Sequence, residues 1–192
     1  MNINKLPSEI FVTGTDTGIG KTVVSALLTA GLSATYWKPI QSGLKEETDT
    51  QFVKRVTGLP TDYFVQERYR LQEPLSPHAS AEIDGVSISL ADFRIPEYET
   101  DRLIVEGAGG LMVPINDETM IIDLIEYLDL PVLMVARSEL GTLNHTFLSL
   151  EALRSRGVPI IGVIMNGPKN ESNRKAIEKY GKVKVIGEIE SI

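Results

Sequence analysis

The feature that most constrains the fold is a glycine-rich segment between an apolar run and a stretch of helical periodicity. The segment GTDTGIGKT, residues 14–22, follows IFVT at 10–13 and opens a predicted helix over 20–33. Its ending Gly20-Lys21-Thr22 is typical of a phosphate-binding loop, although five residues separate Gly14 from Gly20 where the common pattern has four. A glycine-rich turn without a ligand is the simpler alternative, but the Lys-Thr pair at a strand-to-helix junction favours phosphate binding.

Further apolar runs alternate with helical patterns along the chain. Strands are predicted over 34–40, 102–107, 131–137, 159–166 and 183–189, and helices over 49–57, 120–128, 143–156 and 171–180. The strands are apolar almost throughout, as in parallel sheets that helices cover on both faces. We therefore predict an α/β fold with an open, mainly parallel sheet, similar to P-loop NTPases, in one domain over 1–192. Residues 58–100 hold four of the ten prolines, so loops and short elements are expected there.

The composition narrows the classes of partner. The 192 residues carry 19 Lys and Arg against 26 Asp and Glu, a net charge of -7, which argues against nucleic acid as the main partner. There is no cysteine and there are two histidines, so a metal would need oxygen ligands. No signal peptide and no apolar run long enough to span a membrane is visible, so we expect a cytoplasmic protein without a membrane partner.

Polar residues follow three of the predicted strands where ligands collect in such sheets. Lys38 lies near the end of the predicted strand 34–40, Asp49 follows that strand, and Glu106 lies near the end of 102–107. Taken singly, a solvated lysine, a helix N-cap and a simple turn are the favoured interpretations. Together with Thr22, however, the two carboxylates would offer oxygen ligands to a hard cation, while Lys21 and Lys38 would offset phosphate charge. The set indicates a phosphoryl-transfer site.

Several motifs together resemble one known family. They are FVTGTDTGIGKT, KPIQSG, TD at 48–49, EPLSPH at 73–78, VEGAGGLMVP, LGTLNHT and VIMN, between about Phe11 and Gly187. This set resembles the dethiobiotin synthetases, ATP-dependent enzymes that close the ureido ring in biotin synthesis. In that family the first glycine of the loop lies one place further back than in the common pattern, as it does here.

The resemblance implies roles for individual positions. Lys38 resembles the family's catalytic lysine, and Lys21 is expected to act on the transferred phosphoryl group. Thr22, Asp49 and Glu106 are expected to surround Mg²⁺, and Asn166 to read the adenine. The residues expected to bind ATP are Thr17, Gly18, Ile19, Gly20, Lys21, Thr22, Val23, Asp49, Glu106, Gly107, Ala108, Gly109, Asn166 and Gly167. Those expected near the substrate are Thr15, Ser42, Gly141, Thr142, Leu143 and Asn144.

The implied reaction carboxylates 7,8-diaminopelargonic acid with CO₂ and gives dethiobiotin, ADP and phosphate. It would pass through a carbamate and a carbamic-phosphoric mixed anhydride, and no side chain is assigned as general base. The segment Gly141–Asn144 resembles the part that binds the substrate carboxylate across a dimer interface, so we expect a homodimer. After GEI the family commonly continues with a proline and a segment that helps hold the base, whereas this chain reads Glu190-Ser191-Ile192. Gly167 stands where an acidic residue is frequent, and we therefore expect loose selection of the base.

Two other functions fit the pattern less well. A cobyrinate-type amide synthase normally needs a nucleophilic cysteine in a glutaminase domain, and the chain has none. A partitioning ATPase of the deviant-loop kind would carry a lysine five positions before Lys21, where Asp16 stands. We further expect His78 and His145 to be structural and Trp37 to lie in the core.

Overall fold

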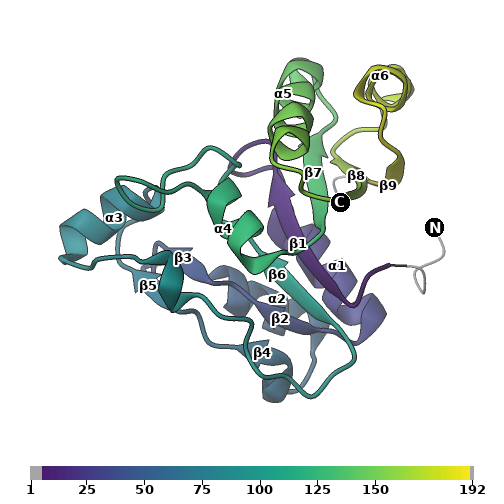
Figure 1. The fold of residues 1–192 in the computed structure, drawn as a ribbon. Coiled ribbons are helices and arrows are strands. Elements are labelled where there is room, and N and C mark those ends of the chain that lie inside the picture. The colour runs from purple at the N-terminus through teal and green to yellow at the C-terminus, as the bar shows by residue number, and fades with distance from the viewer. Residues whose placement is uncertain (1–5, 191–192) are drawn as a thin grey trace.

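A parallel sheet of seven strands forms the middle of the molecule (Figure 1). The computed structural model describes residues 6–190. The order along the sheet is β4-β2-β6-β1-β7-β8-β9, and every pair of neighbours runs parallel. The strands are Phe64–Val65 (β4), Thr35–Trp37 (β2), Leu103–Glu106 (β6), Glu9–Gly14 (β1), Val132–Arg137 (β7), Ile160–Asn166 (β8) and Val185–Ile189 (β9).

The central strand β1 shows why the apolar runs do not alternate with polar residues. Ile10, Phe11 and Val12 are all fully buried. Because side chains alternate across a strand, Phe11 joins the hydrophobic cluster on one face, while Ile10 and Val12 join the cluster on the other. Both faces of the sheet are therefore core, and the predicted α/β fold with a parallel sheet is confirmed.

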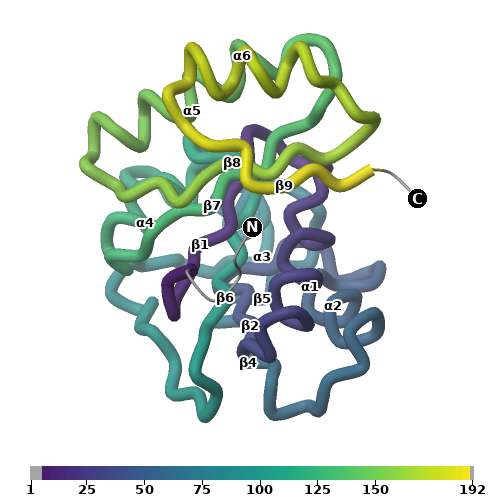
Figure 2. The backbone as a smooth tube through the Cα atoms, turned by 90° about the vertical axis from the view of Figure 1, so that its right-hand side faces the viewer, coloured from purple at the N-terminus to yellow at the C-terminus, as the bar shows by residue number. Residues whose placement is uncertain are grey.

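The two faces are covered by different helices (Figure 2). Helices α1 (Lys21–Leu32) and α2 (Asp49–Thr57) pack on the face of Ile10. Helices α4 (Ile121–Leu128), α5 (Thr142–Ser155) and α6 (Glu171–Gly181) pack on the opposite face. Each of these helices begins and ends within one residue of its predicted range.

The predicted strand over 34–40 is wrong as a single element. β2 ends at Trp37, and after Lys38-Pro39 the chain forms β3 (Ile40–Ser42), which pairs with β5 (Tyr69–Leu71) in a separate two-stranded sheet. Pro39 has no N–H to continue the ladder, and its carbonyl accepts from the backbone N–H of Tyr69. Lys38 therefore stands at a break between two sheets rather than inside a strand.

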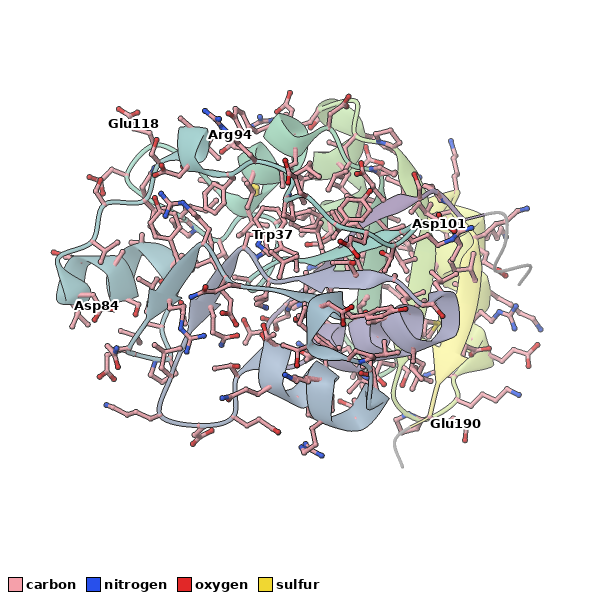
Figure 3. The ribbon with its side chains drawn as sticks, turned by 90° about the horizontal axis from the view of Figure 1, so that it is seen from below. Trp37, Asp84, Arg94, Asp101, Glu118 and Glu190 are labelled. Atoms are coloured by element: carbon pink, nitrogen blue, oxygen red, sulfur yellow. The ribbon has the colours of Figure 1, made fainter. Side chains whose placement is uncertain are left out.

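The region 58–100 consists of short elements, as the sequence predicts. They are the 3₁₀ turns η2 (Thr61–Tyr63) and η3 (Leu90–Asp92), β4, β5 and helix α3 (Pro77–Asp84). Trp37 is 3% exposed and lies well inside the outline of the molecule in Figure 3, where Asp84 and Glu118 mark the periphery. Its predicted place in the core is confirmed. No helix within residues 6–190 is long and apolar enough to cross a membrane.

Candidate active site

A pocket of about 380 Å³ lies at the carboxyl ends of β1, β2 and β6. Ligands of open α/β sheets collect at this edge, and here the phosphate-binding loop, the sheet break and the end of β6 meet. The residues that line it are Thr17, Gly18, Gly20, Lys21, Thr22, Lys38, Ile40, Gln41, Ser42, Asp49, Pro74, Leu75, Ser76, Pro77, Glu106, Ala108, Gly109 and Val113. Many of the residues predicted to bind ATP or Mg²⁺ are therefore brought together.

The loop between β1 and α1 is held by close backbone packing. Gly20 is the residue before α1 and has φ 91°, a left-handed conformation that favours glycine. A Cβ atom at Gly20 would stand 2.1 Å from Nδ2 of Asn166, which donates to the Ile19 carbonyl over 2.9 Å. Ile19 itself is buried in the core. Asn166, predicted to read adenine, contacts the loop from the end of β8 and does not line the pocket.

Lys21 is nearly buried, at 6% exposure, beneath this loop. Its ammonium donates to the Asp16 carbonyl over 2.8 Å. This hydrogen bond holds the Lys21 side chain against the loop that is predicted to bind phosphate. The Asp16 carboxylate accepts from the Thr17 N–H and forms an ion pair with Arg137 at the end of β7. Burial, followed by the charge of Lys38, lowers the pKa of Lys21 to about 8.

Lys38 is buried and lies at the centre of an ion-pair network. Its ammonium lies 2.6 Å from Asp49 Oδ2 and 3.0 Å from Glu106 Oε1, and it donates to the Gly107 carbonyl over 3.0 Å. Burial alone would lower the pKa of Lys38, but the Glu106 and Asp49 carboxylates outweigh it and raise the pKa above its ordinary value. Lys38 is therefore a cation at neutral pH, and all three of its hydrogen-bond donors are used.

Thr22 joins the two carboxylates from the other side. Its Oγ1 lies 2.9 Å from both Asp49 Oδ1 and Glu106 Oε1, and its single proton can serve one of them at a time. Burial acts to raise the pKa of Asp49, yet Lys38 and the Thr22 hydroxyl outweigh it and keep the pKa below its ordinary value. Oxygen atoms from three elements thus converge on one point, the donor type that Mg²⁺ prefers.

Asp49 is free for this role because it does not cap its helix. Thr48 is the N-cap of α2, and its side chain accepts from the Gln51 N–H while the Gln51 side chain accepts from the Thr48 N–H. The alternative that Asp49 is an ordinary N-cap is therefore wrong. Within residues 6–190, no group of three or more His, Asp or Glu side chains is placed to hold a metal. The site described here has two carboxylates, and its third oxygen comes from the Thr22 hydroxyl.

Two contacts of the network were missed from the sequence. The Tyr36 hydroxyl donates to Glu106 Oε2 over 2.9 Å, and Gln41 Oε1 accepts from the Asp49 N–H over 3.1 Å. Burial and the neighbouring Glu106 charge raise the pKa of Tyr36 well above its ordinary value. The signal for Tyr36 is its position two residues before Lys38, which places both side chains on one face of the strand.

Other predicted residues lie outside the 380 Å³ pocket. They are Ile19, Val23, Gly107, Asn166 and Gly167 among the predicted ATP-binding positions, and Thr15 and Gly141–Asn144 among the substrate positions. Thr15 lines a neighbouring pocket of about 310 Å³, between Gly110–Val113 and α5. Gly141 precedes α5, and the segment 141–144 lines neither pocket within one chain. Neither histidine lines the 380 Å³ pocket. The expectation of loose base selection involves Ser191 and Ile192, which lie outside the described residues.

The parallel sheet and the phosphate-binding loop define the structural class of this protein. A family model described as "AAA domain" matches residues 8–192. The structure is similar to a ParA family ATPase from Chlorobium tepidum TLS, with a TM-score of 0.54 and 16% identity over 97% of this chain and 86% of that one. It is also similar to the MinC:MinD cell division protein complex from Aquifex aeolicus, with a TM-score of 0.53 and 16% identity over 97% of this chain and 82% of that chain. This chain therefore has the fold of the P-loop ATPases.

Sequence relatives are more specific. The chain is 50% identical to an ATP-dependent dethiobiotin synthetase BioD from Rhodopseudomonas palustris, over 96% of this chain and 86% of that protein. A BioD from Bradyrhizobium diazoefficiens is 49% identical over 94% of this chain and 86% of its own length. A biotin biosynthesis bifunctional protein BioCD from Bordetella avium is 52% identical over 95% of this chain, which spans 39% of that longer protein. The chain belongs to the ATP-dependent dethiobiotin synthetase family, and the resemblance read from its motifs is confirmed.

Proposed function

We propose that the 380 Å³ pocket is the site where this chain uses ATP to carboxylate 7,8-diaminopelargonic acid and close the ring of dethiobiotin. The observation that carries the proposal is the convergence of two buried lysines, two carboxylates and a threonine hydroxyl at the mouth of a phosphate-binding loop. The sequence is 49–50% identical to two dethiobiotin synthetases over 86% of their length, which supports the same reaction. ATP-dependent biosynthesis of this kind makes the cytoplasm the proposed compartment.

Mg²⁺ would be held by Thr22, Asp49 and Glu106. The Thr22 hydroxyl already lies within hydrogen-bond distance of both carboxylates, and hard oxygen donors of this kind suit the ion. When bound, the ion supplies charge neutralisation for the phosphate oxygens of ATP. The carboxylates that would hold it are the same two that bind the Lys38 ammonium, so loading this site draws on oxygens that Lys38 now occupies.

The phosphates would lie along the loop from Thr17 to Thr22. Glycine-rich turns before a helix point backbone N–H groups at an anion, and the N-terminal end of α1 adds favourable charge. Lys21 would exchange its bond to the Asp16 carbonyl for the transferred phosphoryl group, a short movement because both lie at the same loop. Ala108 and Gly109, after β6, would close the opposite wall.

The chemistry needs three bond exchanges, each balanced in atoms and charge. An amine nitrogen of the diamine attacks CO₂, forms a C–N bond and loses a proton to give a carbamate. A carbamate oxygen then attacks the γ-phosphorus while the bond to ADP breaks. The second amine attacks the carbamoyl carbon, phosphate leaves with the C–O electrons, and the nitrogen passes its proton to the departing phosphate or to solvent. Lys21 and Lys38 would stabilise the negative charge that builds on the phosphoryl oxygens.

Two buried hydroxyls support the placement of the diamine. Thr15 Oγ1 and Ser42 Oγ are buried, and neither has a hydrogen-bond partner in the described part of the chain. An unpaired buried hydroxyl is costly, so a polar ligand that pairs with it is favoured. Ser42 lines the 380 Å³ pocket and Thr15 the adjoining one, which would place the two amines between them.

The substrate carboxylate would be bound by Gly141–Asn144 of a second copy in a homodimer. This segment starts the 14-residue helix α5, whose first N–H groups lack helical partners and suit an anion. Because the segment lines neither pocket of its own chain, a contribution across an interface accounts for its expected role.

A single assay tests the proposed activity. ADP release should require the diamine, bicarbonate and Mg²⁺ together, and equal ATP turnover without the diamine would contradict the proposal. Thr22→Val, which lacks the hydroxyl, should lose most of this turnover, whereas Thr22→Ser, which keeps it, should retain the same Mg²⁺ requirement.

A further inference from the structure

Tyr36 holds the side of Glu106 that faces away from the other charged groups. Its hydroxyl donates to Oε2 over 2.9 Å, whereas Lys38 and Thr22 both contact Oε1. Tyr36 is fully buried, and Glu106 is 1% exposed. Water therefore has almost no access to this carboxylate, and the tyrosine is the partner that the described residues provide for Oε2.

The sheet itself places Tyr36 there. β2 and β6 pair in parallel with Tyr36 beside Ile104 and Trp37 beside Val105. Side chains two apart on a strand share a face, so Tyr36 and Lys38 both point to the face that carries Glu106. Trp37 belongs to the hydrophobic cluster on the opposite face, and Tyr36 to the one beneath α1. Two consecutive residues of β2, Tyr36 and Trp37, thus lie in the hydrophobic clusters on opposite faces of the sheet.

We propose that Tyr36 is a positioning residue for Glu106, which fixes the carboxylate so that Oε1 alone is presented to the Mg²⁺ site. The inference rests on the proposed function, because it needs the metal site that Thr22, Asp49 and Glu106 would form. A carboxylate whose second oxygen is tied to a rigid, buried phenol can neither rotate nor bind an ion through both oxygens. Outer contacts of this kind orient metal ligands, and their loss usually weakens metal binding 10–100-fold.

The chain offers a matched control. Tyr98 donates its hydroxyl to Glu9 Oε1 over 2.7 Å, the same tyrosine-to-glutamate hydrogen bond, but Glu9 is the first residue of β1, at the end of the strand away from the loop. Tyr36→Phe and Tyr98→Phe remove the same chemical group from two places. A general cost of losing a tyrosine hydroxyl would appear in both variants.

Mn²⁺ binding, measured by electron paramagnetic resonance with a non-hydrolysable ATP analogue, gives a readout independent of turnover. Tyr36→Phe should weaken Mn²⁺ binding by about tenfold or more, and Tyr98→Phe should leave it within twofold of the wild type. Equal Mn²⁺ affinity in Tyr36→Phe and the wild type would overturn the inference while leaving the metal site intact. Absence of Mn²⁺ binding by the wild type would overturn the proposed site and the inference with it.

A second variant separates the hydroxyl from the packing of the ring. Tyr36 packs against Phe64, with ring centroids 6.3 Å apart. Phe64→Leu loosens this contact but keeps the hydroxyl, so it should lower the thermal midpoint without changing Mn²⁺ affinity. If Phe64→Leu weakened Mn²⁺ binding as much as Tyr36→Phe, packing rather than the hydrogen bond would orient Glu106, and the inference would be wrong.

Discussion

Two regions at the same edge of the sheet differ in how complete they are within one chain. Around Lys38, the polar groups are buried or half-buried, and they contact one another over 2.6–3.0 Å. At the start of α5, Leu140 is fully exposed, and Gly141–Asn144 line neither pocket. The groups expected to handle phosphate and metal are therefore already in contact with one another, whereas those expected to hold the substrate carboxylate lie outside both pockets.

The largest effect is expected in the organised region, which comprises Lys21, Thr22, Lys38, Asp49 and Glu106. Lys38→Gln should lower kcat by about 10²-fold or more, because losing one donor to transition-state charge has a cost of this size. Lys45→Gln is the control, since Lys45 is an exposed lysine in an ion pair with Glu73 outside the pocket. Steady-state kinetics of both variants tests this, and an unchanged kcat for Lys38→Gln would make that residue structural.

The region at the start of α5 is tested through the substrate. A diamine that lacks the terminal carboxylate should show a KM about 10–100-fold higher, since hydrogen bonds to a charged group contribute about 1.5–3 kcal/mol. The affinity for ATP should stay nearly constant. Should the two diamines give equal KM values, Gly141–Asn144 would have no part in binding the carboxylate.

The low pKa of Lys21 predicts a pH dependence confined to the organised region. A phosphate stabilises the charged ammonium, so binding takes up a proton wherever free Lys21 has lost one, above about pH 8. ATP affinity should therefore fall as pH rises, by about tenfold between pH 7 and pH 9. Calorimetry in buffers of different ionisation enthalpy would detect the proton uptake at pH 9 and little at pH 7. Equal uptake at both values would assign the proton to another group.

The smallest effect is expected at the ion pair between Arg137, which lies ahead of α5, and Asp16 in the phosphate-binding loop. Arg137, at the end of β7, pairs with Asp16 of the loop, but their side chains are 35% and 48% exposed. Solvent screening limits such pairs to about 0–1 kcal/mol. Arg137→Gln should lower the free energy of unfolding by less than about 1 kcal/mol in urea titrations. A loss of several kcal/mol would mean that the pair fixes the loop.

Sequence patterns locate the residues of the organised region but not the bonds between them. Lys38, Asp49 and Glu106 are predicted to share an edge because each lies near or after the end of a predicted strand, and the structure places them together. That Lys38 bridges both carboxylates depends on the break at Pro39 and on the register of β2 with β6, which join residues 68 positions apart. Tyr36 was missed because a tyrosine in an apolar run resembles ordinary core unless its position two residues before Lys38 is taken into account.

The order of the strands has a consequence for when the protein can first bind nucleotide during its synthesis. β1, which leads into the phosphate-binding loop, has no sheet neighbour that is close in sequence, because it pairs with β6 at residues 103–106 and with β7 at 132–135. At roughly 5–20 residues per second, a ribosome needs on the order of 5–25 s to make the chain between β1 and β7. Until β6 is made, the apolar strand β1 has neither of these partners, and until β7 is made it has one of the two. Contacts this distant in sequence also form slowly. The nascent chain therefore depends on late-made strands to shield the first one, and its nucleotide site can form only after most of the protein exists.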